Sequence, residues 1–242
     1  MDQFSHAPKA LETIVRWSRN LEKLSIIPRD FYNPYHAHRP FKEWDFATVQ
    51  PILETQMANL RELSILPLFH GCDQLVRDID NLNLTGFTKL EVLTLSSFQT
   101  GYDTRHIPRI LAPNLRILNW LVPVYNSAEQ WAIPEEWVMP EDGVSPEEWA
   151  IPQDWVSPEE KIEDFDQKKE DWVRAMVDFA AKEQQRLREI YIGFKSQEQG
   201  RGDDELCVVH PARLEKLARD SEKLGIKIRY DGTSIEKVSV LP

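Results

Sequence analysis

The hexapeptide LRILNW at residues 115–120 decides the fold, because its spacing of apolar residues recurs along the chain. Its last three residues alternate apolar, polar and apolar, which is typical of a short β-strand that buries one face. The same pattern appears in LEKLSI (21–26), LRELSI (60–65), LEVLTL (90–95) and LREIYI (187–192), and more loosely in LGIKIRY (224–230). We therefore predict neighbouring strands of one mostly parallel sheet at residues 23–26, 62–65, 92–95, 117–120, 189–192 and 226–229.

Helical patterns separate the predicted strands, as parallel pairing requires. Apolar residues spaced by three or four predict helical faces formed by Leu11, Ile14, Val15 and Ser18; by Trp44, Val49, Ile52, Leu53 and Met57; by Trp172, Met176, Phe179, Ala180 and Leu187; and by Leu214 and Leu217. Residues 107–111 predict a short turn. Pro51 is expected to kink its helix or mark the start, Pro211 to begin the last helix and Gly225 to follow its end.

These patterns together predict an α/β fold: an irregular leucine-rich-repeat-like solenoid with a mostly parallel sheet and helices on its convex side. The units begin 39, 30, 25, 72 and 37 residues apart, which is far from a regular repeat. The alternative is an unrelated α/β domain in which the pattern recurs by coincidence.

A second periodicity occupies residues 131–160, which read WAIPEE, WVMPED, GVSPEE, WAIPQD and WVSPEE. Proline at every sixth position excludes a continuous helix or a central strand. We expect residues 127–166 to form an acidic, flexible insert between solenoid parts at 1–126 and 167–242. Expansion of a short DNA repeat would explain this insert without a function, because a surface loop lengthens at low thermodynamic cost.

The charge of the chain is concentrated in this insert. Of the net charge of −11, residues 127–170 supply fourteen acidic side chains against three lysines, and the remainder holds 26 acidic and 26 basic residues. A nucleic-acid partner is therefore not expected, because phosphate binding needs a basic face. The sequence shows no signal peptide, no apolar run of membrane-spanning length and two distant cysteines, so we expect no membrane association and an intracellular protein, in cytoplasm or nucleus.

No catalytic motif is present: GxSxG, HExxH, GxxxxGK[ST] and GxGxxG are all missing. Three short pairs have metal-like spacing, namely His36 with His38, His70 with Cys72, and Cys207 with His210. They belong to separate repeats, and zinc sites usually combine two such pairs. We therefore expect no catalytic, cofactor-binding or metal-binding residues and no enzyme activity.

Ser145 and Ser157 each begin a Ser-Pro-Glu-Glu sequence. This sequence suits both proline-directed and acidophilic kinases, so the two serines are candidate phosphorylation sites. The alternative is that repeat expansion copied a motif without a function.

Three longer stretches resemble a large group of fungal F-box proteins. HAPKALETIVRWSRNLEKLSI (6–26) is similar to the segment after their F-box, RILAPNLRILNW (109–120) to their recurring LLAPxLxxFxW element, and DWVRAMVDFAAKEQQRLREIYIGF (171–194) to their next helix and strand. The resemblance implies the substrate-binding half of a ubiquitin-ligase receptor. The F-box itself has no match, so we expect a degenerate relative or a truncated gene model, and the protein would reach a cullin-type ligase adaptor only if an F-box is supplied.

We therefore expect a non-enzymatic module that binds a protein partner through the outward residues of its strands. Ile117 and Tyr191 are the best anchors, because large apolar and aromatic contacts dominate interface energetics. The candidate binding residues are Lys23, Ser25, Glu62, Ser64, Val92, Thr94, Ile117, Asn119, Glu189, Tyr191, Lys227 and Arg229. One alternative is that the Trp/Glu hexads bind the partner, and another is an enzyme of unidentified reaction with a pocket between solenoid and insert.

Overall fold

The structure is a computed structural model that describes residues 8–26, 45–66, 79–124, 165–183, 185–196 and 211–231. Within these ranges six strands form one sheet, in the order of the sequence and with every neighbouring pair parallel. The six predicted strands are confirmed, although the last begins one residue later and the third, fourth and fifth run further. The strands are β1 (Lys23–Ile26), β2 (Glu62–Ile65), β3 (Val92–Ser96), β4 (Ile117–Val124), β5 (Glu189–Ser196) and β6 (Lys227–Tyr230).

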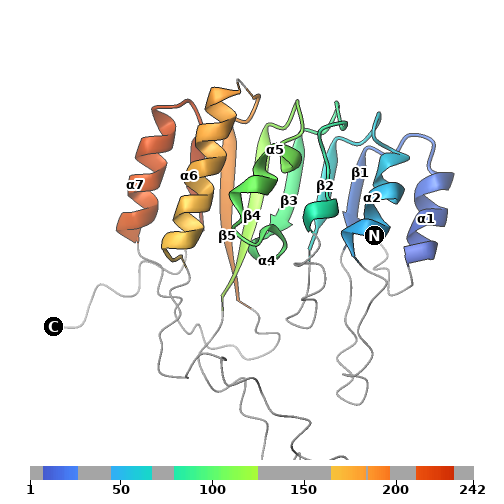
Figure 1. Cartoon of the computed structure of the whole chain (residues 1–242), viewed down its shortest axis with the longest axis horizontal. Coiled ribbons are helices and arrows are strands. Elements are labelled where there is room, and N and C mark those ends of the chain that lie inside the picture. Colours follow the sequence, from blue (N-terminus) through green and yellow to red (C-terminus); the bar gives the residue numbers. More distant parts are fainter. Residues whose placement is uncertain are drawn as a thin grey trace, which may run out of the picture.

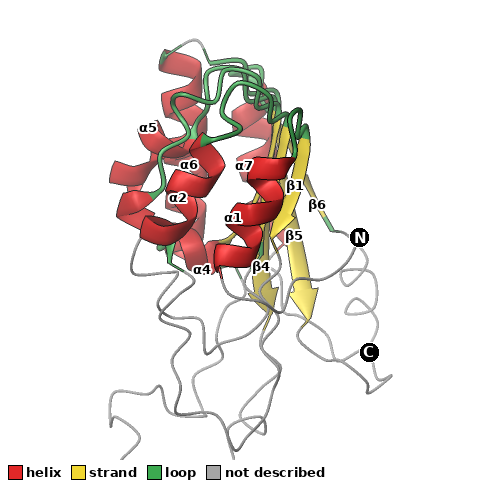
Figure 2. Ribbon diagram, turned by 90° about the vertical axis from the view of Figure 1, so that its right-hand side faces the viewer, coloured by secondary structure: helices red, strands yellow, loops and turns green. Residues whose placement is uncertain are grey.

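The helices lie on one face of this sheet (Figure 2) and follow one another along it in chain order (Figure 1). They are α1 (Pro8–Trp17), α2 (Phe46–Glu54), α4 (Ser97–Thr100), α5 (Ile107–Ile110), α6 (Gln167–Lys182) and α7 (Pro211–Glu222), with 3-10 turns η2 (Ile79–Asn81) and η3 (Thr104–His106). The fold is thus α/β, with an all-parallel sheet and a single helical layer. None of the described helices combines the length and the apolar character that a membrane crossing requires.

Local chemistry accounts for the helix ends. The Asp45 carboxylate accepts a hydrogen bond from the Thr48 N–H at 2.6 Å, and the Asp166 carboxylate accepts one from the Lys169 N–H at 2.9 Å. Each aspartate satisfies an N–H group that has no partner inside its helix. After α7, Gly225 adopts a positive φ of 79°, the left-handed conformation that glycine tolerates best. Pro211 begins α7 as predicted, whereas Pro51 lies inside α2 and does not mark its start.

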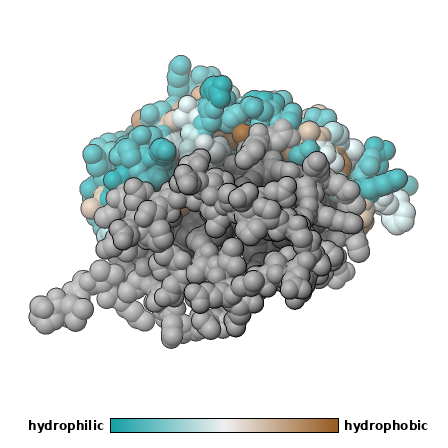
Figure 3. Space-filling model, turned by 60° about the horizontal axis from the view of Figure 1, so that its bottom comes forward, coloured by the Kyte–Doolittle hydropathy of each residue, from teal (hydrophilic) through white to brown (hydrophobic). Residues whose placement is uncertain are grey.

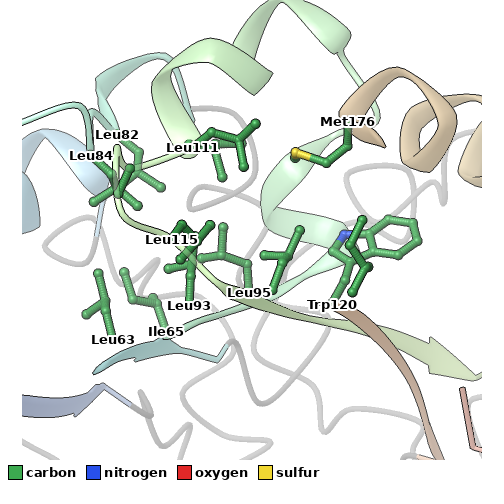
Figure 4. Close-up of a cluster of buried hydrophobic side chains, with 14 of the residues drawn as sticks. Leu63, Ile65, Leu82, Leu84, Leu93, Leu95, Leu111, Leu115, Trp120 and Met176 are labelled. Carbon is green, nitrogen blue, oxygen red and sulfur yellow. The ribbon is translucent and has the colours of Figure 1, made fainter. Parts of the chain in front are cut away.

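The core lies between the helices and the inward residues of the strands. Figure 4 shows Leu63, Leu93, Leu95 and Trp120 together with side chains from the layer above, among them Met176 of α6. All are at most 1% exposed. The leucine that opens each of the four central copies of the pattern is equally buried, because it lies beneath the start of its strand: Leu60, Leu90, Leu115 and Leu187.

An aromatic stack joins β4 to α6 across the long gap in the sequence. The Trp120 and Trp172 rings are nearly parallel, with centroids 4.8 Å apart, and the Trp120 Nε1–H donates to Thr100 Oγ1 at 3.3 Å. Phe165, which was expected to belong to the insert, is fully buried, and its ring meets Phe194 edge to face at 6.4 Å. Phe165 and the capping Asp166 therefore pack with α6.

Several details of the predicted helical faces are wrong. Ile14 is 37% exposed, because α1 ends the helical layer and has a neighbour on one side only. Met57 lies beyond the end of α2 and is 39% exposed, with its sulfur against Gly86. Ser18 follows the last residue of α1. Leu187 is not part of α6, which ends at Lys182; it opens the β5 unit instead.

The division into inward and outward positions predicts how truncation affects stability. Leu93→Ala, Leu118→Ala and Ile190→Ala should each lower the free energy of unfolding by about 2–5 kcal/mol, because each removes a buried side chain and leaves a cavity. Lys23→Ala should change it by less than about 1 kcal/mol, because the Lys23 side chain is 61% exposed. Denaturant midpoints measure the difference, and equal effects at all four positions would contradict the assignment.

Candidate functional site

The helices leave one face of the sheet to their far side (Figure 2), and we call it the open face. The twelve predicted binding residues point to this face, because they alternate along the strands with the buried residues. These residues are exposed or half-buried, in contrast to their strand neighbours Leu63, Leu93 and Leu118, which are at most 1% exposed. The parallel register aligns the twelve in two rows that cross all six strands. The structure thus brings together residues that lie up to about two hundred positions apart in the sequence.

The first row has an apolar centre between charged ends. It runs Lys23, Glu62, Val92, Ile117, Glu189 and Lys227. Lys23 Nζ lies 2.6 Å from Glu62 Oε1, and the Glu189 carboxylate lies 3.4 Å from Arg229 Nε of the second row. Val92 and Ile117 lie side by side and half-buried, so an approaching partner would meet aliphatic surface there first.

The second row carries uncharged polar side chains on its first four strands and larger side chains on the last two. It runs Ser25, Ser64, Thr94, Asn119, Tyr191 and Arg229. The Asn119 Nδ2–H donates to Thr94 Oγ1 at 3.1 Å, which orients the amide along the row. The side chains of this row are small over β1 to β3, whereas β5 and β6 carry the larger Tyr191 and Arg229.

Tyr191 is held in place by a residue that the sequence pattern did not single out. Its hydroxyl donates to one oxygen of the Asp231 carboxylate, and the other oxygen accepts from the Phe194 N–H at 3.2 Å. This hydrogen bond to Asp231 raises the pKa of the Tyr191 phenol to about 12. Asp231 lies beyond the end of β6, at the next outward position, so extending the alternation past Tyr230 would have indicated it.

The tyrosine ring also depends on the absence of a side chain at Gly193. A Cβ at that position would lie 3.1 Å from Tyr191 Cε1 and 2.7 Å from Leu121 Cδ2. Both neighbours therefore approach the β5 backbone more closely than a larger residue would allow. Leu121 and Gly193 continue the outward positions of β4 and β5 and extend the apolar part of the open face.

A charged rim lies where the strands begin, formed by the residue before each of β1 to β5: Glu22, Arg61, Glu91, Arg116 and Arg188. Arg61 reaches Glu22 at 3.9 Å and Glu91 at 3.0 Å, and Arg116 reaches Glu91 at 3.8 Å. The prediction of binding residues missed this rim. The signal was the charged second position of every hexapeptide, which becomes a row only when the strands are in register.

On the helical side, a polar depression of about 570 Å³ lies between α6 and α7. Arg174 lies 2.8 Å from Glu170 and 3.2 Å from Asp220, and Arg213 lies 3.6 Å from Glu170. Hydrogen bonds from Lys223 and Arg174 lower the pKa of the Asp220 carboxyl. These ion pairs cross-link the two helices, so we assign them a structural role. The lining residues are Gln167, Glu170, Arg174, Ala212, Arg213, Lys216 and Asp220.

Figure 3 shows a mainly hydrophilic surface over the described residues in its view, with small and separate hydrophobic spots. In the part of the chain that the structure describes, no three His, Cys, Asp or Glu side chains gather to hold a metal ion. The three metal-like pairs of the sequence and the candidate phosphorylation sites Ser145 and Ser157 lie outside the described residues.

The contact between Tyr191 and Asp231 predicts an unusual phenol titration. The difference in absorbance between the protein and its Tyr191→Phe variant should report a phenol that ionises near pH 12. In Asp231→Ala this transition should move down towards 10, the ordinary value for tyrosine. Because the folded pKa is raised above the unfolded value, the contact stabilises the fold fully below pH 10, and that contribution is lost as the pH rises through 12. An unchanged transition in Asp231→Ala would contradict the assigned contact.

Neither a scan against protein-family models nor a search of curated proteins found a match to this chain. The geometry of the open face is therefore the basis on which a function can be proposed.

Proposed function

We propose that this protein is a non-enzymatic protein-interaction module that binds a partner through the open face of a leucine-rich-repeat-like solenoid. The observation that supports it best is the alignment of outward residues in two rows across all six strands, on a sheet that is covered by helices on its other face. A parallel sheet normally has both faces covered. None of the described elements covers this face of the sheet, and such a face can serve as a surface for recognition.

The solenoid interpretation rests on strand order and on the one-sided helical layer. Doubly wound α/β domains reverse their strand order at a switch point and carry helices on both faces. Here each strand pairs with its neighbours in the sequence, and every crossover helix lies on the same side. In a solenoid each unit buries its apolar residues against adjacent units, which tolerates the unequal spacings of this chain.

The composition of the open face favours a protein partner over a small molecule. Six strands spaced by about 4.8 Å span about 24 Å, close to the width of a small protein interface. Val92, Ile117 and Tyr191 supply apolar and aromatic contacts near the middle, and charged residues surround them. An apolar centre with a polar surround is the usual anatomy of such an interface.

The sequence resemblance favours the substrate-binding half of an F-box-type ubiquitin-ligase receptor, or a degenerate relative of such a receptor. The similar stretches supply α1 with β1, α5 with β4, and α6 with β5. Recovery of a ligase adaptor and cullin with the purified protein would support the receptor role. Recovery of a partner without the adaptor and cullin would support the alternative, a degenerate relative that no longer joins a ligase.

Substitutions of two isoleucines test the open face. Ile117→Lys places a charge at the centre of the first row, and Ile14→Lys places the same charge on half-exposed α1, outside the open face. The partner captured by the unchanged protein should be lost with Ile117→Lys, about tenfold or more, and retained with Ile14→Lys. Affinity purification with quantitative mass spectrometry measures the recovery, and melting temperatures confirm that both variants fold.

Equal recovery with both variants would contradict binding by the open face. The acidic hexads are the competing binding element, and deletion of residues 128–164 tests them separately. Binding that survives this deletion and is lost with Ile117→Lys supports the open face. The opposite result supports the hexads.

A further inference from the structure

We propose that the part of the open face over β4 to β6 recognises an acidic, extended peptide segment of the protein partner. This inference rests on the proposed function and adds the chemistry of the ligand. The residues that carry it are Lys227 and Arg229 of the open face with Arg116 and Arg188 of the adjoining rim, and we call these four the basic patch.

Over β1 to β3 both cations already have a carboxylate partner. Lys23 pairs with Glu62 at 2.6 Å, and Arg61 lies between Glu22 at 3.9 Å and Glu91 at 3.0 Å. The two cations are therefore both engaged by the three carboxylates of this half. An incoming charged group would have to displace an existing ion pair, so this half discriminates little between acidic and basic ligands.

Over β4 to β6 cations exceed carboxylates. Arg116 reaches only the far oxygen of Glu91 at 3.8 Å, and the other oxygen of that carboxylate is held by Arg61. Glu189 is engaged by Arg229 at 3.4 Å. Among the described residues, Arg188 and Lys227 have no carboxylate partner, and the Arg188 guanidinium donates to the neighbouring Leu187 carbonyl at 3.5 Å.

The register explains why this excess arises. On the rim, Arg188 follows Arg116 on adjacent strands, where the alternation of signs would require a carboxylate. The corresponding position before β6 is Ile226, which is 2% exposed and contributes no charge to the rim. In the first row Lys227 faces Glu189, but Arg229 already holds that carboxylate. Two adjacent cations are thus left on the surface, although the chain as a whole carries a net charge of −11.

The geometry suits several carboxylates spaced along an extended chain. Arg116 and Arg188 precede paired strands, which are about 4.8 Å apart, and side chains on the same side of an extended peptide are about 7 Å apart. Long and flexible arginine side chains can span this difference of about 2 Å. Guanidinium groups bind carboxylates through paired hydrogen bonds, which fixes the orientation of the ligand. Ile117 and Tyr191 lie beside the patch and offer contacts to apolar residues between the acidic ones.

Binding of labelled peptides tests the proposal on the full chain. The probe is a peptide of about ten residues that alternates Glu and Ala, and its control alternates Gln and Ala. Fluorescence anisotropy should show binding of the Glu peptide that weakens with added salt, and no binding of the Gln peptide. A short single-stranded DNA oligonucleotide provides a third probe and should bind more weakly than the Glu peptide.

Two matched double variants locate the site. Arg188→Glu with Lys227→Glu should weaken binding of the Glu peptide about tenfold. Lys23→Glu with Arg61→Glu changes the net charge by the same amount over β1 to β3, where the cations are already paired. This double variant should weaken binding of the Glu peptide about twofold or less. The corresponding Gln variants repeat the comparison with smaller disturbance if a charge reversal impairs folding.

Equal weakening by the two pairs would overturn the proposal, as would equal binding of the Gln peptide or tighter binding of DNA. Peptide binding that appears only after deletion of residues 128–164 would also overturn it, because the chain's own acidic segment would then occupy the patch. Failure of the proposed function has a different signature, namely partner capture that is unaffected by Ile117→Lys. If Ile117→Lys loses partner capture but the Glu peptide does not bind the unchanged protein, the proposed interaction module stands and the proposed acidic ligand is wrong.

Discussion

The alternation of buried and outward residues along six parallel strands is the constraint on which the rest of this structure depends. Leu93, Leu118 and Ile190 face the helices and are almost completely removed from water, which supplies the main driving force for folding. Because successive strand residues point to opposite faces, their neighbours must point outward. Parallel hydrogen bonding then aligns these neighbours from strand to strand. The two rows of the open face follow from the burial of the core.

The same constraint shows how the chain accommodates its fourth and fifth units, which begin 72 residues apart. β4 and β5 pair over eight residues, the longest pairing among the described strands. The Trp120 and Trp172 stack and the buried Phe165 fasten α6 to these strands on either side of the gap. Each stacked indole buries a large apolar surface, so these contacts offset the entropy of closing a long loop, which grows only slowly with length. A segment between residues 124 and 165 can therefore vary in length without a break in the sheet.

The surface charges follow a different logic from the core. Exposed ion pairs contribute little to stability, so selection of the charged residues on the rim and rows is free to reflect binding. Over β1 to β3 the pairs are complete, and over β4 to β6 they are not. In the proposed function this asymmetry gives the open face a direction, with an aliphatic centre at Val92 and Ile117 and a basic end for an acidic ligand. The acidic character of the whole chain would repel nucleic acid and leave this basic end available to a peptide.

The sequence by itself determined the positions of all six strands, the order of strand and helix, and the identity of the twelve outward residues. It could do so because a period of two residues within a strand and of three or four within a helix is a local property. The exposure of Ile14, the ion pairs along the rim of Glu22, Arg61, Glu91 and Arg116, and the hydrogen bond between Tyr191 and Asp231 were decided by the tertiary structure alone. Each depends on which neighbour lies alongside at a distance of tens of residues in the chain. The register of the sheet and the ends of its helical layer set those neighbours, and no local pattern of residues encodes them.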